Sequence, residues 1–294
     1  MTNARTVARA QTGTQGLDDI LAGGLAPGHV YLLEGNPGTG KTTLALKFLL
    51  SGAEKGEAGL YITLSESDSE LRAGAASHGW TIDGKIEVFE LVPPESRLDP
   101  DMQQSLLYSS DLELGETTKL IFEAIERVKP KRIVLDSLSE IRLLAQNSLR
   151  YRRQILALKH YFSRSGATVL LLDDLTSEVM DKTVHSVVHG VIRLEELAPD
   201  YGAERRRLRV MKYRGTRFRG GWHDFVIQTG GVVVFPRLVA SEHRTRFDRG
   251  QSASGIKELD ALLGGGIERG SSVLVIGPAG TGKSTFVFQF IESA

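Results

Sequence analysis

The stretch Gly35-Asn36-Pro37-Gly38-Thr39-Gly40-Lys41-Thr42 decides the fold, because it joins a short apolar run to a helical pattern. It fits the pattern G-x-x-x-x-G-K-[ST], whose glycines allow main-chain N–H groups to surround phosphate oxygens. The lysine of such a loop contacts the β- and γ-phosphates of a nucleotide, and the last hydroxyl binds Mg²⁺. We therefore predict ATP and Mg²⁺ as cofactors. The residues expected to bind them here are Gly38, Thr39, Gly40, Lys41, Thr42 and Thr43.

Outward from this loop, short apolar runs alternate with helical patterns, which is typical of a parallel sheet covered by helices on both faces. The expected strands are residues 30–33, 60–64, 86–92, 132–135 and 168–172. The expected helices are residues 43–53, 69–77, 117–128 and 149–163, and residues 93–115 are expected to be irregular. Glycine-rich turns between residues 191 and 235 indicate antiparallel strands at the sheet edge. The predicted fold class is α/β, with a twisted, mostly parallel sheet.

Two acidic residues follow predicted strands at the carboxyl edge of the sheet, where open α/β sheets bind their ligands. Asp136 ends the apolar run Ile133-Val134-Leu135 and is expected to hold Mg²⁺ through water. Glu66 follows the strand at residues 60–64 and could orient or deprotonate an attacking water, so we predict it as the catalytic base. The structural alternatives are a strand cap for Asp136 and a solvated loop acid for Glu66.

A dense basic segment lies between residues 205 and 219, and consists of Arg205, Arg206, Arg207, Arg209, Lys212, Arg214, Arg217 and Arg219. Three interpretations compete: a nucleic-acid groove, phosphate-contacting residues, or a strand face neutralised by Glu195, Glu196 and Glu204. Lys212 and Arg214 are two residues apart on a predicted strand, so they share a face and could grip a γ-phosphate together. His185 and His189 have the i, i+4 spacing of metal ligands, but no third ligand is placed beside them, which favours a core or surface role.

A second loop of the same pattern, Gly277-Pro278-Ala279-Gly280-Thr281-Gly282-Lys283-Ser284, lies near the carboxyl terminus. It belongs to a repeat. When Gly35 is aligned with Gly277, an offset of 242, fifteen residues between positions 13 and 48 meet identical ones. Several of these precede the loop, where phosphate binding would not require them, so we infer a gene duplication.

The second copy ends at Ala294, after its expected strand, loop and helix, and we expect this chain to be a fragment of a longer tandem protein. We expect the terminal segment to be poorly packed, to pack abnormally or to borrow contacts from elsewhere, because its apolar residues have no partner strands within this chain. The second loop is expected to bind phosphate without hydrolysing ATP. The residues concerned are Gly280, Thr281, Gly282, Lys283 and Ser284.

Composition narrows the class of protein. The 294 residues include 36 basic and 36 acidic side chains, and this neutral balance argues against nucleic acid as a partner. The hydrophobic content of 41% is that of a globular protein, and no apolar run approaches the roughly 18–20 residues of a membrane span. The absence of cysteine excludes a disulfide and a thiolate nucleophile. We expect a cytoplasmic protein without a signal peptide.

The chain resembles the KaiC family in Gly16-Leu17-Asp18, Gly23-Gly24-Leu25, the phosphate loop, Ser65-Glu66, Asp136-Ser137 and Lys212-Tyr213-Arg214-Gly215-Thr216. The resemblance covers nearly the whole chain and implies a RecA-like P-loop NTPase core. It implies an N-terminal arm (1–11), a first ATPase domain (12–240), a linker (241–250) and the truncated start of a second domain (251–294). Family members form two-tiered hexamers with ATP between neighbouring subunits, so the resemblance also implies a homo-oligomer.

The resemblance implies roles for particular residues. One subunit would supply Lys41, Thr42, Glu66 and Asp136. Its neighbour would reach the γ-phosphate with Lys212 and Arg214. Ser77, Tyr213 and Thr216 fall where the family contacts the nucleoside and the phosphates.

Two departures from the family pattern matter. Ser65 stands where the family usually has the first of two adjacent glutamates, which bears on the rate of hydrolysis. Residues 102–115 also differ from the corresponding segment of the family's clock protein. That protein engages its partner near this segment, so a circadian role does not follow. Autophosphorylation belongs to the second domain of the family, whose phosphorylated region is absent from this chain.

The sequence thus predicts an oligomeric ATPase whose hydrolysis is coupled to assembly or to signalling through protein partners. One alternative is a DNA-dependent recombinase of the RecA or RadA type, against which the zero net charge and the missing cysteine-rich zinc region count. Another is a scaffold that binds ATP to assemble but scarcely hydrolyses it, an interpretation that Ser65 keeps open.

Overall fold

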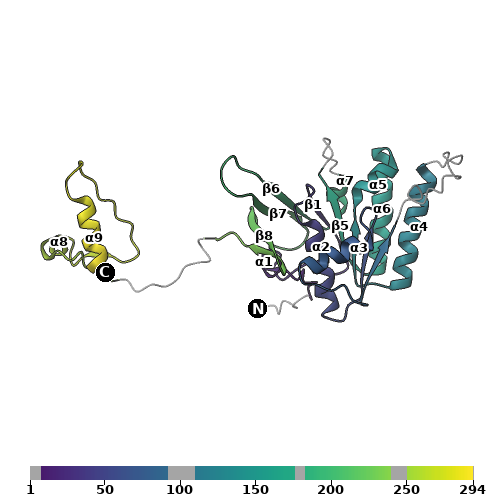
Figure 1. Ribbon diagram of the computed structural model, residues 1–294, viewed down its shortest axis with the longest axis horizontal. Helices are drawn as coiled ribbons and strands as arrows, with labels where there is room; N and C mark the ends of the chain where they lie inside the picture. Colours follow the sequence, from purple (N-terminus) through teal and green to yellow (C-terminus); the bar gives the residue numbers. More distant parts are fainter. Residues whose placement is uncertain (1–7, 92–109, 176–182, 240–249, 294) are drawn as a thin grey trace. The chain divides into compact units, whose positions relative to one another are not determined.

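The computed structural model describes residues 8–91, 110–175, 183–239 and 250–293. The chain divides into two compact units, Met1–Arg237 and Leu238–Ala294, and each is described by itself (Figure 1). Residues 1–7 of the expected arm, 241–249 of the expected linker and 102–109 of the family-divergent segment lie outside the described residues. Within the described ranges, every helix is too short or too polar to cross a membrane.

Nine strands of the described chain form one sheet in the first unit, in the order β3-β2-β4-β5-β1-β6-β7-β8-β9. Their bounds are β1 Val30–Gly35, β2 Gly59–Thr63, β3 Ile86–Glu90, β4 Arg132–Asp136, β5 Thr168–Asp174, β6 Gly190–Leu197, β7 Arg205–Tyr213, β8 His223–Gln228 and β9 Gly231–Phe235. Pairing is parallel from β3 to β6 and antiparallel from β6 to β9. Every residue of β1, β2 and β4 is buried, as expected of parallel strands covered on both faces.

The helices described in the first unit are α1 Gln15–Ile20, α2 Lys41–Ala53, α3 Asp68–Ser77, α4 Ser110–Val128, α5 Leu138–Ala145, α6 Ser148–Ser165 and α7 Thr183–Val187. Local sequence sets several of their ends. A capping box begins α3, in which the side chains of Ser67 and Glu70 each accept the other's main-chain N–H. The Asn147 side chain caps the start of α6, and Gly166 ends that helix in the left-handed conformation.

The sheet carries an apolar core on each face. Leu17, Leu44 and Leu71 of α1, α2 and α3 pack on one face with Tyr31 and Leu33 of β1. Helices α4 to α7 pack on the other face, which receives the alternate residues of β1. Figure 1 shows α4, α5 and α6 beside one another. The predicted α/β class, a mostly parallel sheet with helices on both faces and antiparallel strands at one edge, is confirmed.

The sequence prediction was wrong about several elements. Residues 110–115 were expected to be irregular but belong to α4, because Leu114 extends the buried stripe of Ile121 and Ile125 toward the start of the helix. The short helix α5 was missed, although its buried residues recur at helical spacing. Helices α1 and α7 span only six and five residues, too few for periodicity to show.

The second unit contains β10 Gln251–Ser252, α8 Lys257–Leu262, β11 Ile267–Glu268 and α9 Lys283–Ser293. Its first residues repeat local structure of the first unit. Asp18 Oδ1 accepts the N–H of Thr12 at 2.8 Å, and Asp260 Oδ1 accepts that of Ser254 at 2.7 Å. The same sequence pattern therefore folds the same way locally in both places.

The strand expected before the second loop is not formed, which corrects the sequence prediction. Leu274 and Ile276 are 81% and 83% exposed and have no regular structure. In the first unit, β1 obtains its hydrogen bonds from β5 and β6, and no strand in the described part of the second unit takes their places. Helix α9 buries none of its residues, so the predicted poor packing of this segment is confirmed.

Candidate nucleotide-binding site

The loop between β1 and α2 has the backbone that a phosphate cradle requires. Gly38 and Gly40 have φ values of 81° and 92°, which glycine adopts without strain. A Cβ added at Gly40 would lie 2.6 Å from Cδ1 of Ile227, so a side chain there would also require the end of Ile227 to move. The loop leads directly into the amino terminus of α2, where main-chain N–H groups favour an anion.

Lys41 is held by three acceptors at the base of this loop. Its Nζ donates to the carbonyl oxygens of Gly35 and Asn36 at 2.8 Å and 3.0 Å. It also forms an ion pair with Oδ1 of Asp174 at 2.7 Å, in which the side chains of Lys41 and Asp174 are 8% and 29% exposed. Asp174, the last residue of β5, was missed from the sequence. The sequence did contain a signal for this residue, because β5 is a third parallel strand that ends in acidic residues at the carboxyl edge of the sheet.

Asp136 and Thr42 meet at the hydroxyl of Tyr61. The tyrosine donates to Oδ2 of Asp136 at 2.5 Å, and the Thr42 side chain also hydrogen-bonds to it. Burial raises the pKa of Asp136 and the charge of Asp174 raises it further, while Tyr61 and Lys41 act in the opposite direction. The structure thus brings together the hydroxyl and the carboxylate predicted to hold Mg²⁺.

These donors fit a magnesium ion that arrives with a nucleotide. Carboxylate and hydroxyl oxygens are the ligands Mg²⁺ prefers, and it is usually held by one or two carboxylates together with phosphates. Among the described residues, no group of three or more histidines, aspartates or glutamates could hold a metal by itself. Thr42, with Asp136 acting directly or through water, would hold such an ion, and phosphate oxygens and waters would supply its other ligands.

Glu66 lies in the turn after β2, and Thr63 fixes that turn. The Thr63 hydroxyl donates to the carbonyl oxygen of Glu66 at 2.8 Å and accepts its N–H at 2.9 Å. Burial raises the pKa of Glu66, and the neighbouring charges of Asp136, Glu70 and Asp174 raise it further, against the opposing charge of Lys41. A carboxylate whose pKa is raised is better able to accept a proton near neutral pH.

A hollow of about 360 Å³ lies beside the phosphate loop, between α2 and α3. Its lining includes Thr42, Thr43, Glu66, Ser77 and His78. Residues predicted separately to contact the phosphates, the water and the nucleoside therefore share one cavity. The fold thus brings two segments, residues 42–46 and 66–78, to the walls of one candidate nucleotide site.

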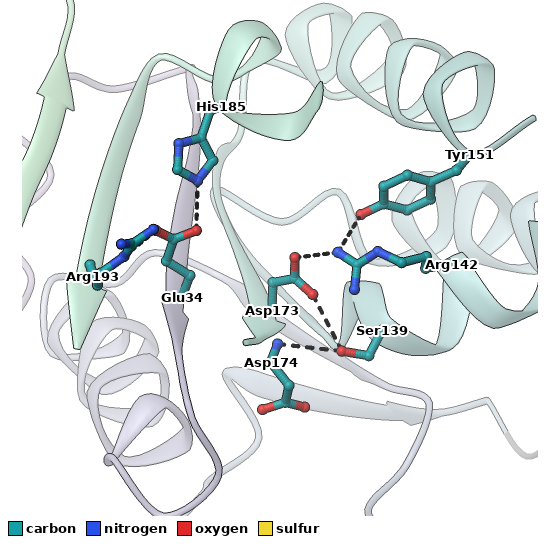
Figure 2. A network of polar contacts seen from close by, with 8 residues as sticks. All are labelled: Glu34, Ser139, Arg142, Tyr151, Asp173, Asp174, His185 and Arg193. Carbon is teal, nitrogen blue, oxygen red and sulfur yellow. Dashed lines mark hydrogen bonds and ion pairs between the residues drawn. The ribbon is translucent and has the colours of Figure 1, made fainter. Parts of the chain in front are cut away.

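Near the end of β1, Figure 2 shows the buried carboxylate of Glu34 held by a histidine and an arginine. His185 Nε2 lies 2.7 Å from Oε2 of Glu34, and Arg193 Nη2 lies 2.7 Å from its other oxygen. Burial alone would raise the pKa of Glu34, but these two partners outweigh it and the pKa is lowered. His189 instead packs against the ring of His29 at 4.0 Å. His185 and His189 therefore have different protein partners, which supports the core or surface role predicted for them.

A second network in Figure 2 supports the end of β5. Arg142 Nη2 donates to Asp173 at 2.6 Å, and the same guanidinium donates to the hydroxyl of Tyr151. The Ser139 hydroxyl donates to Asp173 and accepts the main-chain N–H of Asp174, each at 3.3 Å. These contacts from α5 and α6 fix the strand end that presents Asp174 to Lys41.

Lys212 and Arg214 are not near the phosphate loop of the same chain. Tyr213, between them, is paired with Gly190 at the start of β6, whereas Gly35 is level with Leu194 four residues later. Four residues of a strand correspond to about 13 Å. The pair therefore lies toward the amino-terminal edge of β1, opposite the edge that carries the loop.

Carbonyl oxygens, rather than carboxylates, bind these two cations. Lys212 Nζ donates to the carbonyl oxygens of His185 and Val188, the second at 2.8 Å. Arg214 Nη2 donates to that of Ser186 at 2.7 Å. Burial lowers the pKa of Lys212, and the charge of Arg214 lowers it further. Among the described residues, neither side chain forms an ion pair with a carboxylate at these contacts.

The earlier part of the basic segment has acidic partners. Arg206 and Arg207 pair with Glu196 and Glu195 at 3.1 Å and 2.8 Å. Arg205 pairs with Asp224 at 2.7 Å. For these residues the interpretation of a neutralised strand face is confirmed, and it separates them from Lys212 and Arg214.

Tyr213 and Thr216 are tied to the amino-terminal part of the chain. The Tyr213 side chain is buried, and its hydroxyl donates to Gly24 O at 2.9 Å and accepts the N–H of Ala26 at 2.8 Å. Arg9 donates to the hydroxyls of both Tyr213 and Thr216. Any contact of Tyr213 with a nucleotide would therefore involve its main chain.

The second loop has the local geometry of the first. Lys283 Nζ donates to the carbonyl oxygens of Gly277 and Pro278, as Lys41 does to the equivalent positions. Within the described residues, Lys283 has no carboxylate partner comparable with Asp174. Among the described residues, the second loop thus lacks an acidic partner of the kind that the end of β5 provides for the first loop.

The sheet, the loop and the acids at its edge define a P-loop protein with a RecA-like core. A family model described as "ATPase: KaiC" matches residues 10–239 and 252–294, and the chain therefore belongs to the KaiC family of ATPases. Circadian clock oscillator proteins KaiC from Parathermosynechococcus lividus and Prochlorococcus marinus (strain MIT 9313) are 30% and 32% identical to it, over 99% and 98% of this chain. The chain covers 54% and 58% of those proteins, little more than half their length.

A solved structure supports the same assignment. The crystal structure of a KaiC-like protein from the hyperthermophilic archaeon Pyrococcus horikoshii OT3 is 29% identical in sequence and superposes with a TM-score of 0.65. The match covers 78% of this chain and 100% of that chain. Membership of an ATPase family implies that the chain binds nucleotide.

Proposed function

We propose that this chain hydrolyses ATP at a site completed by a neighbouring copy of itself. One observation carries the proposal: Lys41 and the pair Lys212–Arg214 lie toward opposite edges of one sheet, about 13 Å apart along the strands. An arginine side chain cannot close that separation within one subunit. Repeated head-to-tail contacts of this kind generate a closed ring when the rotation closes, and the family resemblance favours a hexamer.

Within such a site, one subunit would bind the nucleotide. Lys41 would leave Asp174 and bind the β- and γ-phosphates, while Thr42 and Asp136 would hold Mg²⁺. When bound, Mg²⁺ supplies neutralisation of the charge that develops on the phosphates. Glu66 would orient the attacking water and accept its proton, with Thr63 keeping the turn in place.

The neighbouring subunit would supply Lys212 and Arg214 to the γ-phosphate. We further propose residues 12–240 as the first ATPase domain and 251–294 as part of a second, whose loop binds phosphate without catalysis. Protein partners that sense the nucleotide state would connect hydrolysis to signalling. A scaffold with little hydrolysis remains the competing function, because Glu66 follows Ser65 and not a second acid.

An ATPase assay on the wild type, Glu66→Gln and Arg214→Ala tests the proposal, with size-exclusion chromatography in the presence and absence of ATP. Both variants should lose turnover, Arg214→Ala by about a thousand-fold or more if it acts as an arginine finger. Arg205→Ala is the matched control, because Arg205 lies at the start of β7, is paired with Asp224 of β8 and should be dispensable.

The outcomes separate the alternatives. Turnover that is unchanged by Arg214→Ala in an assembled sample would refute the shared site. Assembly with ATP but without measurable turnover in the wild type would establish the scaffold. A many-fold stimulation by single- or double-stranded DNA would instead favour the recombinase.

A further inference from the structure

A hollow of about 390 Å³ lies at the amino-terminal edge of β1. The side chains that give it chemical character are His29, Lys159, Ser163, His189 and Arg214. No carboxylate is among its lining residues, all of which belong to the described part of the chain. A cavity with several bases and no acid is suited to an anion.

Lys159 is the member of this hollow that the proposed function does not use. It projects from α6, whereas Arg214 follows β7, so two separate elements bring the cations together. Within the described chain, Lys159 has neither an ion pair nor a hydrogen bond. Its charge is close enough to Lys212 to lower the pKa of that residue, after the larger effects of burial and Arg214.

The surroundings of His189 show the same local excess of positive charge. His189 contacts the ring of His29 at 4.0 Å and the edges of the Tyr31 and Tyr213 rings. Its pKa is lowered to about 4 by burial and then by the charges of His29, Arg214 and Lys212. An anion placed among these groups would offset the positive charges that lower the pKa of His189.

We propose that Lys159 is a third cation which, with Lys212 and Arg214, binds the terminal phosphate of the nucleotide held by the neighbouring subunit. The inference rests on the proposed function, because it assumes that Arg214 acts across the interface. Arg214 provides the planar fork that matches phosphate oxygens, and Lys159 provides a point charge on a flexible side chain from α6.

The first test compares ATP turnover of Lys159→Ala, Lys159→Arg and the wild type. The alanine variant should lose about ten- to a hundred-fold, the range expected for one charged hydrogen bond, and the arginine variant should recover most of it. Lys119→Ala on the exposed side of α4 is the control and should behave as wild type. No loss in Lys159→Ala would overturn the inference.

The second test asks whether Lys159 acts across the interface. Lys159→Ala, which keeps its own loop, is mixed with Lys41→Ala, which keeps its own Lys159. In an equal, random mixture about a quarter of the interfaces pair an intact loop with an intact Lys159, whatever the ring size. Activity should therefore return to about a quarter of wild type.

The same mixture made with Arg214→Ala distinguishes the two levels of the proposal. If Arg214→Ala is rescued and Lys159→Ala is not, the shared site stands and the role of Lys159 is overturned. If neither is rescued, the proposed function itself fails.

A third arm distinguishes the neighbour's nucleotide from free phosphate. The ring signals of His189 are followed by NMR while inorganic phosphate is added to ATP-free protein. A shift at sub-millimolar phosphate that disappears in Lys159→Ala would show that the hollow takes the free anion, which would overturn the assignment to the neighbour's nucleotide. We expect no such shift until ATP assembles the protein.

Discussion

The ion pair between Lys41 and Asp174 predicts that replacing the acid will tighten nucleotide binding. In the proposed site Lys41 contacts the phosphates, yet its Nζ lies 2.7 Å from Asp174 Oδ1. Binding therefore has to break this contact. Asp174→Asn keeps the shape and the main-chain N–H that bonds to Ser139, and removes only the charge.

The size of the effect follows from the contact that is lost. A hydrogen bond to a charged group contributes about 1.5–3 kcal/mol. Asp174 is 29% exposed, so water weakens the pair and we take about 1–2 kcal/mol. This free energy corresponds to about a 5- to 30-fold lower dissociation constant for ATP. Asp174 also raises the pKa of Glu66 and Asp136, which indicates that its charge acts where phosphate charge would be placed.

The measurement is equilibrium binding of a fluorescent ATP analogue to the full chain. It is made with EDTA present, so that any effect of Asp174 on Mg²⁺ does not enter the affinity. Asp224→Asn is the control, because Asp224 lies on β8, three strands away from β1, and pairs with Arg205. Unchanged or weaker binding by Asp174→Asn would refute the idea that Asp174 competes with the nucleotide for Lys41.

Three further substitutions test packing and charge. Gly52→Ala on α2 should destabilise the fold by about 1–3 kcal/mol, because its methyl group would lie 2.5 Å from the side chain of Arg132, which three hydrogen bonds hold in place. Gly74→Ala on α3 meets open space and should instead stabilise by up to about 1 kcal/mol; equal shifts in Tm for the two variants would contradict this. His189→Asn should flatten the pH dependence of Tm. The pKa of His189 is lowered from 6.5 to about 4 on folding, so the unfolded chain binds more protons than the folded chain between these pH values. The wild type therefore loses stability as the pH falls through this range. Thermal melts of both proteins from pH 6.5 to pH 4 check this, and parallel curves would exclude it.

Sequence alone identified the parts of the molecule that depend on neighbouring residues. The phosphate loop needs glycines at fixed positions, and these can be read directly from the chain. The strands beside it are continuous apolar runs because both of their faces are buried, and the acid Asp136 ends one of them. Thr42, Glu66 and Ser77 were likewise named from the motifs or the family resemblance, and the structure places them around one hollow.

Only the tertiary structure decided which distant residues meet. Asp174 reaches Lys41 because β5 lies beside β1 in the sheet, and nothing in the spacing of the two residues announces that order. Lys159 joins Arg214 because α6 crosses the amino-terminal edge of β1. The strand before the second loop was predicted from its apolar residues but is not formed, since a strand needs hydrogen bonds from neighbours that the second unit does not provide in its described residues. Local sequence thus determined what each segment can form and bind. Strand order and partner availability, which are properties of the whole sheet, decided which of those segments became a site.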